Sequence, residues 1–141
     1  MPKKFPLSLF ASIAVSGLLL GCQLPAQHTG VPSFGSVAQI MSISPDTIEV
    51  LRSGEHVKLK VDVDYVLTAD SGEIKLVVLD ENSSGLAQDV KAITKGRGQV
   101  TLKAEFTVPR TSVIRVFAPL VVQGQNLTTT VDGRAFTVAT N

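Results

Sequence analysis

The 141-residue sequence contains one cysteine, no tryptophan, one tyrosine and six phenylalanines. A lone thiol cannot form a disulfide within the chain, so an internally cross-linked domain is excluded. So few aromatic rings leave no platform on which nucleic-acid bases or sugars could stack. The 13 lysines and arginines are balanced by 12 acidic side chains, so no basic field exists to attract nucleic acid. We therefore expect no nucleic-acid partner.

Motifs that identify common enzyme classes are also absent from the sequence. It has no G-x-S-x-G, no H-E-x-x-H and no pair of cysteines. His56 could act as a base only beside a nucleophile or an orienting carboxylate, and no motif supplies either. We therefore expect a protein that is not an enzyme and needs no cofactor, with His56 at an exposed strand edge.

The first 21 residues have the pattern of a signal peptide. Lys3 and Lys4 form a positive start, and an apolar stretch follows over residues 7–20. This stretch of about 14 residues is shorter than the roughly 20 that a permanent membrane-spanning helix needs. Without Lys3 and Lys4, the mature chain would carry 13 − 2 = 11 basic against 12 acidic side chains, close to neutrality.

The apolar stretch ends in Leu19-Leu20-Gly21-Cys22, which resembles the lipobox of bacterial lipoproteins. In that family the cysteine thiol receives diacylglycerol before the signal peptide is cleaved. The resemblance implies that Cys22 carries lipid, such as palmitate, and anchors the chain to a membrane of the bacterial cell envelope. Gln23 stands where an aspartate would favour inner-membrane retention in enteric bacteria, so the resemblance favours the outer membrane of a Gram-negative host. The alternative is an ordinary signal peptide followed by an incidental cysteine.

Residues 22–37 have the composition of a tether. Pro25, Gly30 and Pro32 lie among small and polar residues, with no sustained period of 2 or 3.6. As a flexible coil of about 15 residues, the segment would hold a domain roughly 20 Å from the lipid. His28 lies in this segment, where a solvated linker side chain is favoured over a metal ligand.

Alternation of apolar and polar residues predicts two clear β-strands, at residues 56–67 and 99–108. Residues 74–79 are apolar at nearly every position, as in a strand covered on both faces. Further strands are expected at residues 38–44, 47–51, 87–94, 112–122 and 128–139. Turn residues separate these segments, among them Ser53-Gly54, Asp70-Ser71-Gly72, Gly96-Arg97-Gly98, Gln123-Gly124 and Asp132-Gly133.

Seven or eight short strands in about 100 residues predict an all-β domain over residues 38–141, a single antiparallel β-sandwich. The order of the turns around the long alternating strand resembles the immunoglobulin-like or fibronectin type III-like domains of bacterial surface proteins. A transthyretin-like sandwich is the alternative. The pattern Cys…Trp…Cys is absent, which excludes an antibody-type domain.

Residues 80–85 match the opening of a calcium loop, because Asp80, Asn82 and Ser84 place oxygen atoms at alternate positions before Gly85. The twelfth position is Lys91 in place of the glutamate that such a loop requires. A hairpin loop in which Gly85 adopts a positive φ is therefore favoured over a metal site. Asp80, Asn82 and Ser84 remain weak candidates for cation binding.

Asp62 and Asp64 would share one face of the strand at residues 56–67, where paired carboxylates could bind a cation or act as acid and base. Lys58 and Lys60 share that face, so a solvated surface with cross-strand ion pairs is the favoured interpretation. Lys95-Gly96-Arg97-Gly98 could hold phosphate on its backbone N–H groups. It lacks the spacing of a phosphate-binding loop, and a tight turn with two surface charges is favoured.

The apolar segment Ala118-Pro119-Leu120-Val121-Val122 is our candidate for a contact surface, with Leu120, Val121 and Val122 as its key residues. The favoured function is a non-catalytic module, held at the membrane through Cys22, that binds or assembles with a protein of the envelope. One alternative is a pilotin-like accessory lipoprotein of a secretion or surface-assembly system. Another is a module that binds a cation or small ligand through Asp80, Asn82 and Ser84.

Overall fold

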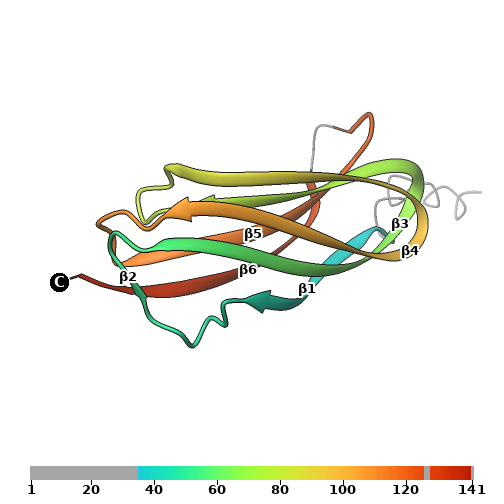
Figure 1. Ribbon diagram of the computed structural model, residues 1–141. Helices are drawn as coiled ribbons and strands as arrows, with labels where there is room; N and C mark the ends of the chain where they lie inside the picture. The colour runs from blue at the N-terminus through green and yellow to red at the C-terminus, as the bar shows by residue number, and fades with distance from the viewer. Residues whose placement is uncertain (1–34, 126–127, 141) are drawn as a thin grey trace, which may run out of the picture. The chain divides into compact units, whose positions relative to one another are not determined.

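The computed structural model describes residues 35–125 and 128–140, which form strands joined by turns (Figure 1). In chain order the strands are β1 (Val37–Ser44), β2 (Leu51–Arg52), β3 (His56–Leu79), β4 (Gly85–Thr107), β5 (Val113–Val122) and β6 (Thr128–Ala139). No helix in these two ranges is long and apolar enough to cross a membrane. The predicted all-β class is confirmed. The expected signal peptide, His28, Cys22 and most of the tether at 22–37 lie outside the described residues.

The two longest strands, β3 and β4, pair with each other along nearly their whole length. Their antiparallel pairing runs from His56 opposite Thr107 to Leu79 opposite Gly85, with a shift of register between Leu67 and Ser71. At this shift both strands bend back on themselves (Figure 1). Each strand therefore contributes its first half to one layer of a sandwich and its second half to the other.

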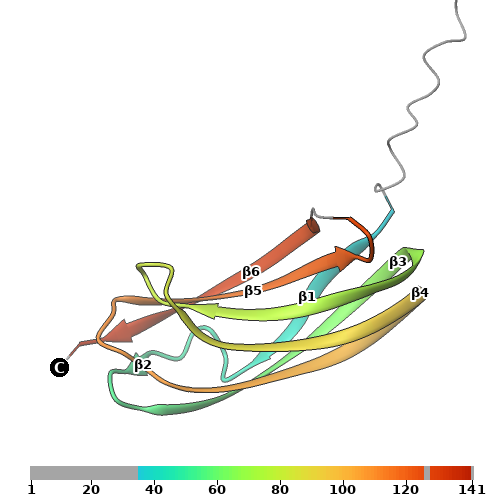
Figure 2. The same ribbon diagram turned by 90° about the horizontal axis from the view of Figure 1, so that it is seen from above.

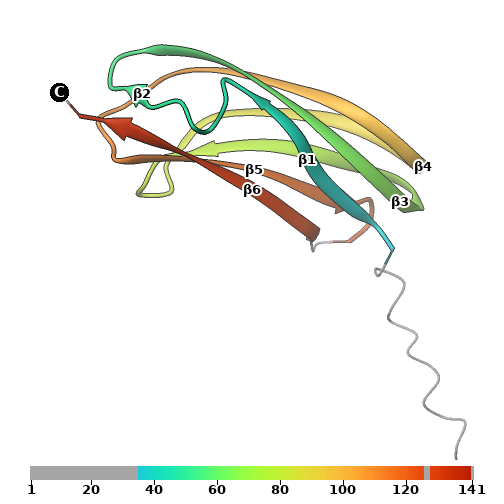
Figure 3. The same cartoon turned by 90° about the horizontal axis from the view of Figure 1, so that it is seen from below.

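The two layers follow from the partners of these halves (Figures 2 and 3). One layer holds β1, residues 56–67 of β3 and residues 96–107 of β4. The other holds residues 85–94 of β4, residues 71–79 of β3, then β5 and β6, and β2 pairs in parallel with the end of β6. This is an immunoglobulin-like sandwich, as predicted. Seven or eight strands were expected, and the described ranges contain six. The number is smaller because β3 and β4 each join two expected strands into one.

The expected turns at residues 70–72 and 96–98 are bends within continuous strands. Gly96 has φ +120°, a conformation that residues with a side chain rarely adopt. Gly98 lies beneath the ring of Tyr65, whose hydroxyl would lie 2.7 Å from an added Cβ. Glycine here curves a strand and admits a cross-strand ring, so the prediction of a tight basic turn at Lys95-Gly96-Arg97-Gly98 is wrong.

Three other local predictions need correction. The strand expected at residues 47–51 begins only at Leu51, with β2. Before it lies a turn in which the side chain and carbonyl of Asp46 accept hydrogen bonds from the N–H groups of Ile48 at 3.1 Å and Glu49 at 2.9 Å. Asp132-Gly133 continues β6, where Gly133 pairs with Phe117. Residues 74–79 bury one face completely, while the other is only half-buried.

The core lies between the layers and is built by the period of 2 that the strands share. From one layer it receives side chains such as Leu59 and Val61, and from the other Leu76, Ile114 and Phe136, each at most 2% exposed. Full burial of such a side chain contributes about 1.5–3 kcal/mol. These side chains form one apolar cluster, so the two layers are held together mainly by hydrophobic packing.

At one side of the sandwich, β1 and β6 are joined by side chains. Ile40 N–H donates to Asp132 Oδ2 at 2.8 Å, and Arg134 Nη2 donates to the Ile40 carbonyl at 3.1 Å. Arg134 Nη1 also donates to Asp132 Oδ1 at 2.7 Å. Partial burial raises the pKa of Asp132, but the hydrogen bonds from Ile40 and Arg134 outweigh it and hold this pKa below its ordinary value.

At the opposite side, one aspartate of β4 connects the two layers. Asp89, in the first half of β4, accepts a hydrogen bond from the backbone N–H of Lys103, in the second half, at 2.9 Å. Its other carboxylate oxygen accepts from Val90 N–H at 2.8 Å. Both sides of the sandwich thus have an aspartate that binds a backbone amide of the facing layer, which satisfies a donor that no neighbouring strand takes.

We expect Asp132→Ala to lower the free energy of unfolding by about 1–3 kcal/mol, because Ile40 loses its acceptor and Arg134 its ion-pair partner. Asp132→Asn keeps an acceptor oxygen and should lower it less. Because the folded pKa is depressed, the part of the difference between native chain and Asp132→Ala that depends on the carboxylate charge should be present above the ordinary pKa of 3.8 and be lost as the pH falls through the folded pKa. Urea unfolding followed by circular dichroism measures this, and equal losses for both variants would contradict the role of the Ile40 bond.

Candidate functional site

The candidate calcium loop is a hairpin loop closed on its own backbone. Asp80 Oδ1 accepts hydrogen bonds from the N–H groups of Asn82 at 2.9 Å and Ser84 at 2.8 Å. The positive φ lies at Ser83, at +65°, and Gly85 does not have one, so that detail of the prediction is wrong. The Asp80 carboxylate is therefore directed toward its own loop. Within residues 35–125 and 128–140, no three His, Cys, Asp or Glu side chains lie close enough to hold a metal ion.

Glu81, beside this loop, is bonded to the segment before β5. Its carboxylate accepts hydrogen bonds from the hydroxyl of Ser112 and from the backbone N–H of Ser112, the latter at 3.1 Å. These bonds hold the pKa of Glu81 below its ordinary value. Glu81 N–H in turn donates to the buried Thr111 hydroxyl at 3.3 Å. Glu81 thus fixes the loop to the sandwich.

Asp62 and Asp64 are bonded to neighbouring strands and do not converge on a common site. Asp62 accepts hydrogen bonds from the hydroxyls of Thr101 at 2.6 Å and Ser42 at 2.8 Å, and Lys60 lies 3.3 Å away. The Thr101 bond, then the Ser42 bond, hold the pKa of Asp62 below its ordinary value. Asp64 accepts from the side-chain amide of Gln99 at 2.8 Å. The surface is solvated, as predicted, but the bonds that reach these two aspartates from other strands come from hydroxyl and amide donors, and Lys60 lies on the same strand as Asp62.

His56 has a carboxylate partner, because its Nε2 lies 3.4 Å from Glu105 Oε2 on the paired strand. Both side chains are more than half exposed, and Lys58 lies 3.9 Å from the same carboxylate. An exposed pair at the start of a strand has the geometry of a surface ion pair. His56 is exposed and begins a strand, as predicted, although β3 is paired there with β4, His56 lying opposite Thr107.

The predicted contact surface is mostly buried. Leu120 and Val122 belong to the core, with 0% and 4% exposure, and only Val121 of the three lies partly on the surface. The reason is the position of β5, which has β3 on one side and β6 on the other. Its alternate residues enter the core, so Leu120 and Val122 are unsuitable for contact with a partner.

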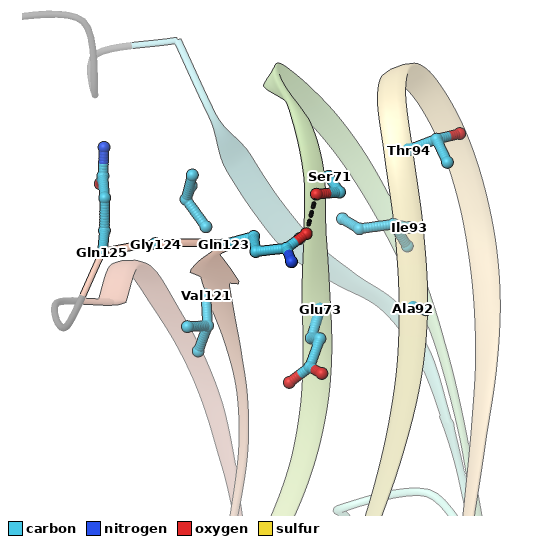
Figure 4. A pocket seen from close by; sticks show the side chains of 11 residues that line it. Ser71, Glu73, Ala92, Ile93, Thr94, Val121, Gln123, Gly124 and Gln125 are labelled. Atoms are coloured by element: carbon cyan, nitrogen blue, oxygen red, sulfur yellow. Dashed lines mark hydrogen bonds between the residues drawn. The ribbon is translucent and has the colours of Figure 1, made fainter.

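Val121 nevertheless borders a hollow of about 400 Å³ on the layer that contains β5 (Figure 4). The hollow spans β4, β3 and β5 near the bend. Ile93 and Gln123 point toward Ser71 from either side of β3, and the Ser71 hydroxyl donates a hydrogen bond to the Gln123 side chain. The lining combines apolar surface, neutral hydroxyl and amide groups and one carboxylate, from Ser71, Glu73, Ile93, Thr94, Val121, Gln123 and Gln125.

The hollow lies at the end of the domain where β1 begins. Ser36 Oγ and Thr68 Oγ1 share a hydrogen bond of 2.9 Å, and Thr68 N–H donates to Ser36 Oγ at 3.1 Å. Thr68 borders a second hollow that shares Ser71 and Gln123 with the first. The chain therefore enters the sandwich beside these two hollows.

Apart from residues of the expected turns, only Val121 and Val122 of the hollow stand out in the sequence. Its lining comes from segments about 20 and 30 residues apart, and each segment is an ordinary part of a strand or turn. The one local signal is Gln123-Gly124, which predicts the turn that the structure shows, with Gly124 at φ +81°. Only the pairing of β3 with both β4 and β5 brings these residues together.

No family model matches the sequence, and no curated protein matches it. Among solved structures, a β-glucuronidase of glycoside hydrolase family 2 is similar over 74% of this chain and 11% of its own length, at 13% identity and a TM-score of 0.48. A family 2 member from Bacteroides cellulosilyticus is similar over 75% and 15%, at 11% identity and 0.49. The chain thus corresponds to a small part of these enzymes. A CARDB domain from Pyrococcus furiosus, solved in complex with di-metal ions, is similar over 76% and 96%, at 13% identity and 0.47.

We expect Thr101→Val to raise the pKa of Asp62 toward its ordinary value of 3.8, because the hydroxyl that donates to the carboxylate is lost. Thr107→Val, on the same strand but without a bond to Asp62, should leave it unchanged. Carbon-detected NMR titration measures both. A carboxylate whose folded pKa is depressed stabilises the fold at pH values above its unfolded pKa. The loss of this stabilisation in Thr101→Val should therefore lower the free energy of unfolding at neutral pH and be absent at a pH below both pKa values.

The burial of β5 gives a second prediction. Leu120→Ala should lower the free energy of unfolding by about 2–5 kcal/mol, because it leaves a cavity in the core. Val121→Ala removes a partly exposed side chain and should cost less than about 1.5 kcal/mol. Chemical denaturation of the two variants measures the difference. A small effect at both positions would show that Leu120 lies at the surface.

Proposed function

We propose that this chain is a bacterial envelope lipoprotein whose β-sandwich binds a protein partner and catalyses no reaction. The observation that carries the anchoring step is Leu19-Leu20-Gly21-Cys22. In this proposal residues 1–21 are removed, Cys22 is acylated, and the lipid holds the chain at the membrane. Two or more fatty-acid chains are needed for stable anchoring, since each buried methylene contributes about 0.8 kcal/mol. Gln23 favours the outer membrane as the destination.

The place where the chain enters the domain supports this arrangement. Twelve residues, 23–34, lie between Cys22 and Gly35, where the described part begins. If they form the proposed tether, a flexible coil of that length would have an end-to-end distance of roughly 20 Å. Ser36 is bonded to Thr68 at the end of the sandwich that carries the hollow. A lipid on Cys22 would therefore keep the hollow within a few tens of ångströms of the membrane, where envelope proteins pass or assemble.

The chemistry of the hollow favours a polypeptide as partner. Its hydroxyl and amide groups can both donate and accept hydrogen bonds, which suits the neutral backbone of a peptide. Ile93 and Val121 offer apolar surface for a side chain. Among the carboxylates that could serve catalysis, Asp62, Glu81 and Glu105 are bonded to neighbouring residues elsewhere on the surface. Glu73, at the hollow, lies 3.7 Å from Lys75 in an exposed ion pair. The hydrogen-bonding groups and the apolar side chains of the hollow therefore favour binding of a polypeptide as its role.

The test is cross-linking in intact cells followed by capture of the detergent-solubilised protein. We expect one envelope protein to be captured with the native chain, and loss of both membrane fractionation and capture with Cys22→Ala. Val121→Arg should abolish capture while leaving fractionation intact, because it fills the hollow with a charge. Val50→Arg, at an exposed valine on the β1–β2 connection, is the matched control and should bind normally.

The outcomes separate the parts of the proposal. If the Cys22→Ala chain still fractionates with membranes, the lipid anchor is wrong. If Val121→Arg and Val50→Arg capture the same protein equally, the hollow is not the binding site. Should the captured protein be a component of a secretion machine, the more specific pilotin-like role follows.

A further inference from the structure

Strand β4 forms the border of both layers on the same side of the sandwich (Figure 2). Its first half, residues 85–94, runs toward the bend, and its second half, residues 96–107, runs away from it. In the described ranges β4 pairs with β3 alone. This side of the domain therefore presents two neighbouring strand edges of opposite direction, one for each layer.

This arrangement is self-complementary. A two-fold axis parallel to the strands, placed beside β4, brings the first half of β4 in one copy next to the second half in the other. The two halves run in opposite directions, so they would pair as antiparallel strands, and each layer would continue from one copy into the next. A two-fold contact of this kind uses the same surface on both copies and closes after two.

The side chain of Asp89 already accepts a hydrogen bond from a backbone N–H group that such a pair would need. Its carboxylate accepts from Lys103 N–H at 2.9 Å, so the first half of β4 already binds the second half within one copy. On the opposite side, Asp132 and Arg134 take both the N–H and the carbonyl of Ile40. On the β4 side, the N–H of Lys103 is bonded only to the carboxylate of Asp89, which lies on an exposed strand. A second copy would have to replace this one hydrogen bond.

We propose that β4 is a self-association edge which the Asp89–Lys103 bond keeps closed, and that its release allows two copies of this chain to pair through β4. The membrane context rests on the proposed function. Copies anchored through Cys22 share one orientation and are confined to a plane, which raises their effective concentration. A two-fold axis along the strands keeps both chain starts at the same end, so the pair is compatible with two anchors in one membrane.

The experiment uses the acylated protein in vesicles of phosphatidylethanolamine and phosphatidylglycerol. Val90→Cys and Lys103→Cys provide thiols at two exposed positions of β4, one in each half of the strand. Within one copy the two positions lie in different layers and face away from each other, whereas in the two-fold pair position 90 of one copy lies beside position 103 of the other on the same face. A short bis-maleimide reports the pair. We compare the native Asp89, Asp89→Ala, which removes the acceptor, and Asp89→Asn, which keeps an acceptor oxygen without the charge. Asp70→Ala, at a fully exposed aspartate, is the matched control.

We expect about tenfold more cross-linked dimer for Asp89→Ala than for native Asp89, the factor that one hydrogen bond of about 1.4 kcal/mol gives. Asp89→Asn and Asp70→Ala should remain near the native level. Equal cross-linking of all four chains overturns the proposal, as does a rise for Asp70→Ala as large as that for Asp89→Ala. Circular dichroism melting identifies a variant that has unfolded. If Asp89→Ala does not fold, Asp89→Val, which also removes the acceptor and suits an exposed strand, takes its place in the comparison with the same expected rise.

The chain without the two added cysteines separates this proposal from the lipoprotein proposal. If that chain is cross-linked through Cys22, the thiol is free and the lipid anchor is wrong. The Asp89 comparison is then made in concentrated solution with Cys22→Ser in every chain, where the same order of variants is expected. Failure of that order overturns the β4 proposal independently of the anchor.

Discussion

The pairing of β3 with β4 determines where every other strand lies. Because β4 follows β3 on one side along almost its whole length, only the other side of β3 is open to further strands. The bend near residues 67–71 divides that open side between the two layers, so β1 pairs with the first half and β5 with the second. The sandwich thus closes around one bent hairpin, and its core fills the space between the hairpin's two halves.

The parts of this fold that the sequence predicts well are those in which one face of a strand is buried. The alternation at residues 56–67 and 99–108 reflects the core directly, so the strands and their inward residues were predicted correctly. Residues 118–122 carry no such contrast, because Pro119 and Val121 are apolar although they face outward. A contact surface was therefore assigned to Leu120 and Val122, which only the flanking strands reveal as core.

The remaining errors concern residues whose role is set by distant partners. Gly96 and Gly98 have the composition of a turn, but both lie in a curved strand. The need for glycine at position 98 depends on the ring of Tyr65, more than 30 residues away. Asp132-Gly133 looks like a turn as well, until β1 supplies the amide that Asp132 binds. The hollow beside Val121 has the same origin, since its lining comes from three strands that meet only in the folded chain.

The position of β1 has a mechanical consequence. β1 is the first strand after the expected lipid attachment, and tension transmitted from Cys22 would enter the domain at Val37 and act along the strand. Antiparallel ladder bonds lie perpendicular to the strands, so such tension loads the bonds between β1 and β3 in shear, all at once. The bonds of Ile40 to Asp132 and Arg134 share that load with β6. A pull on the anchor is therefore resisted by both layers together.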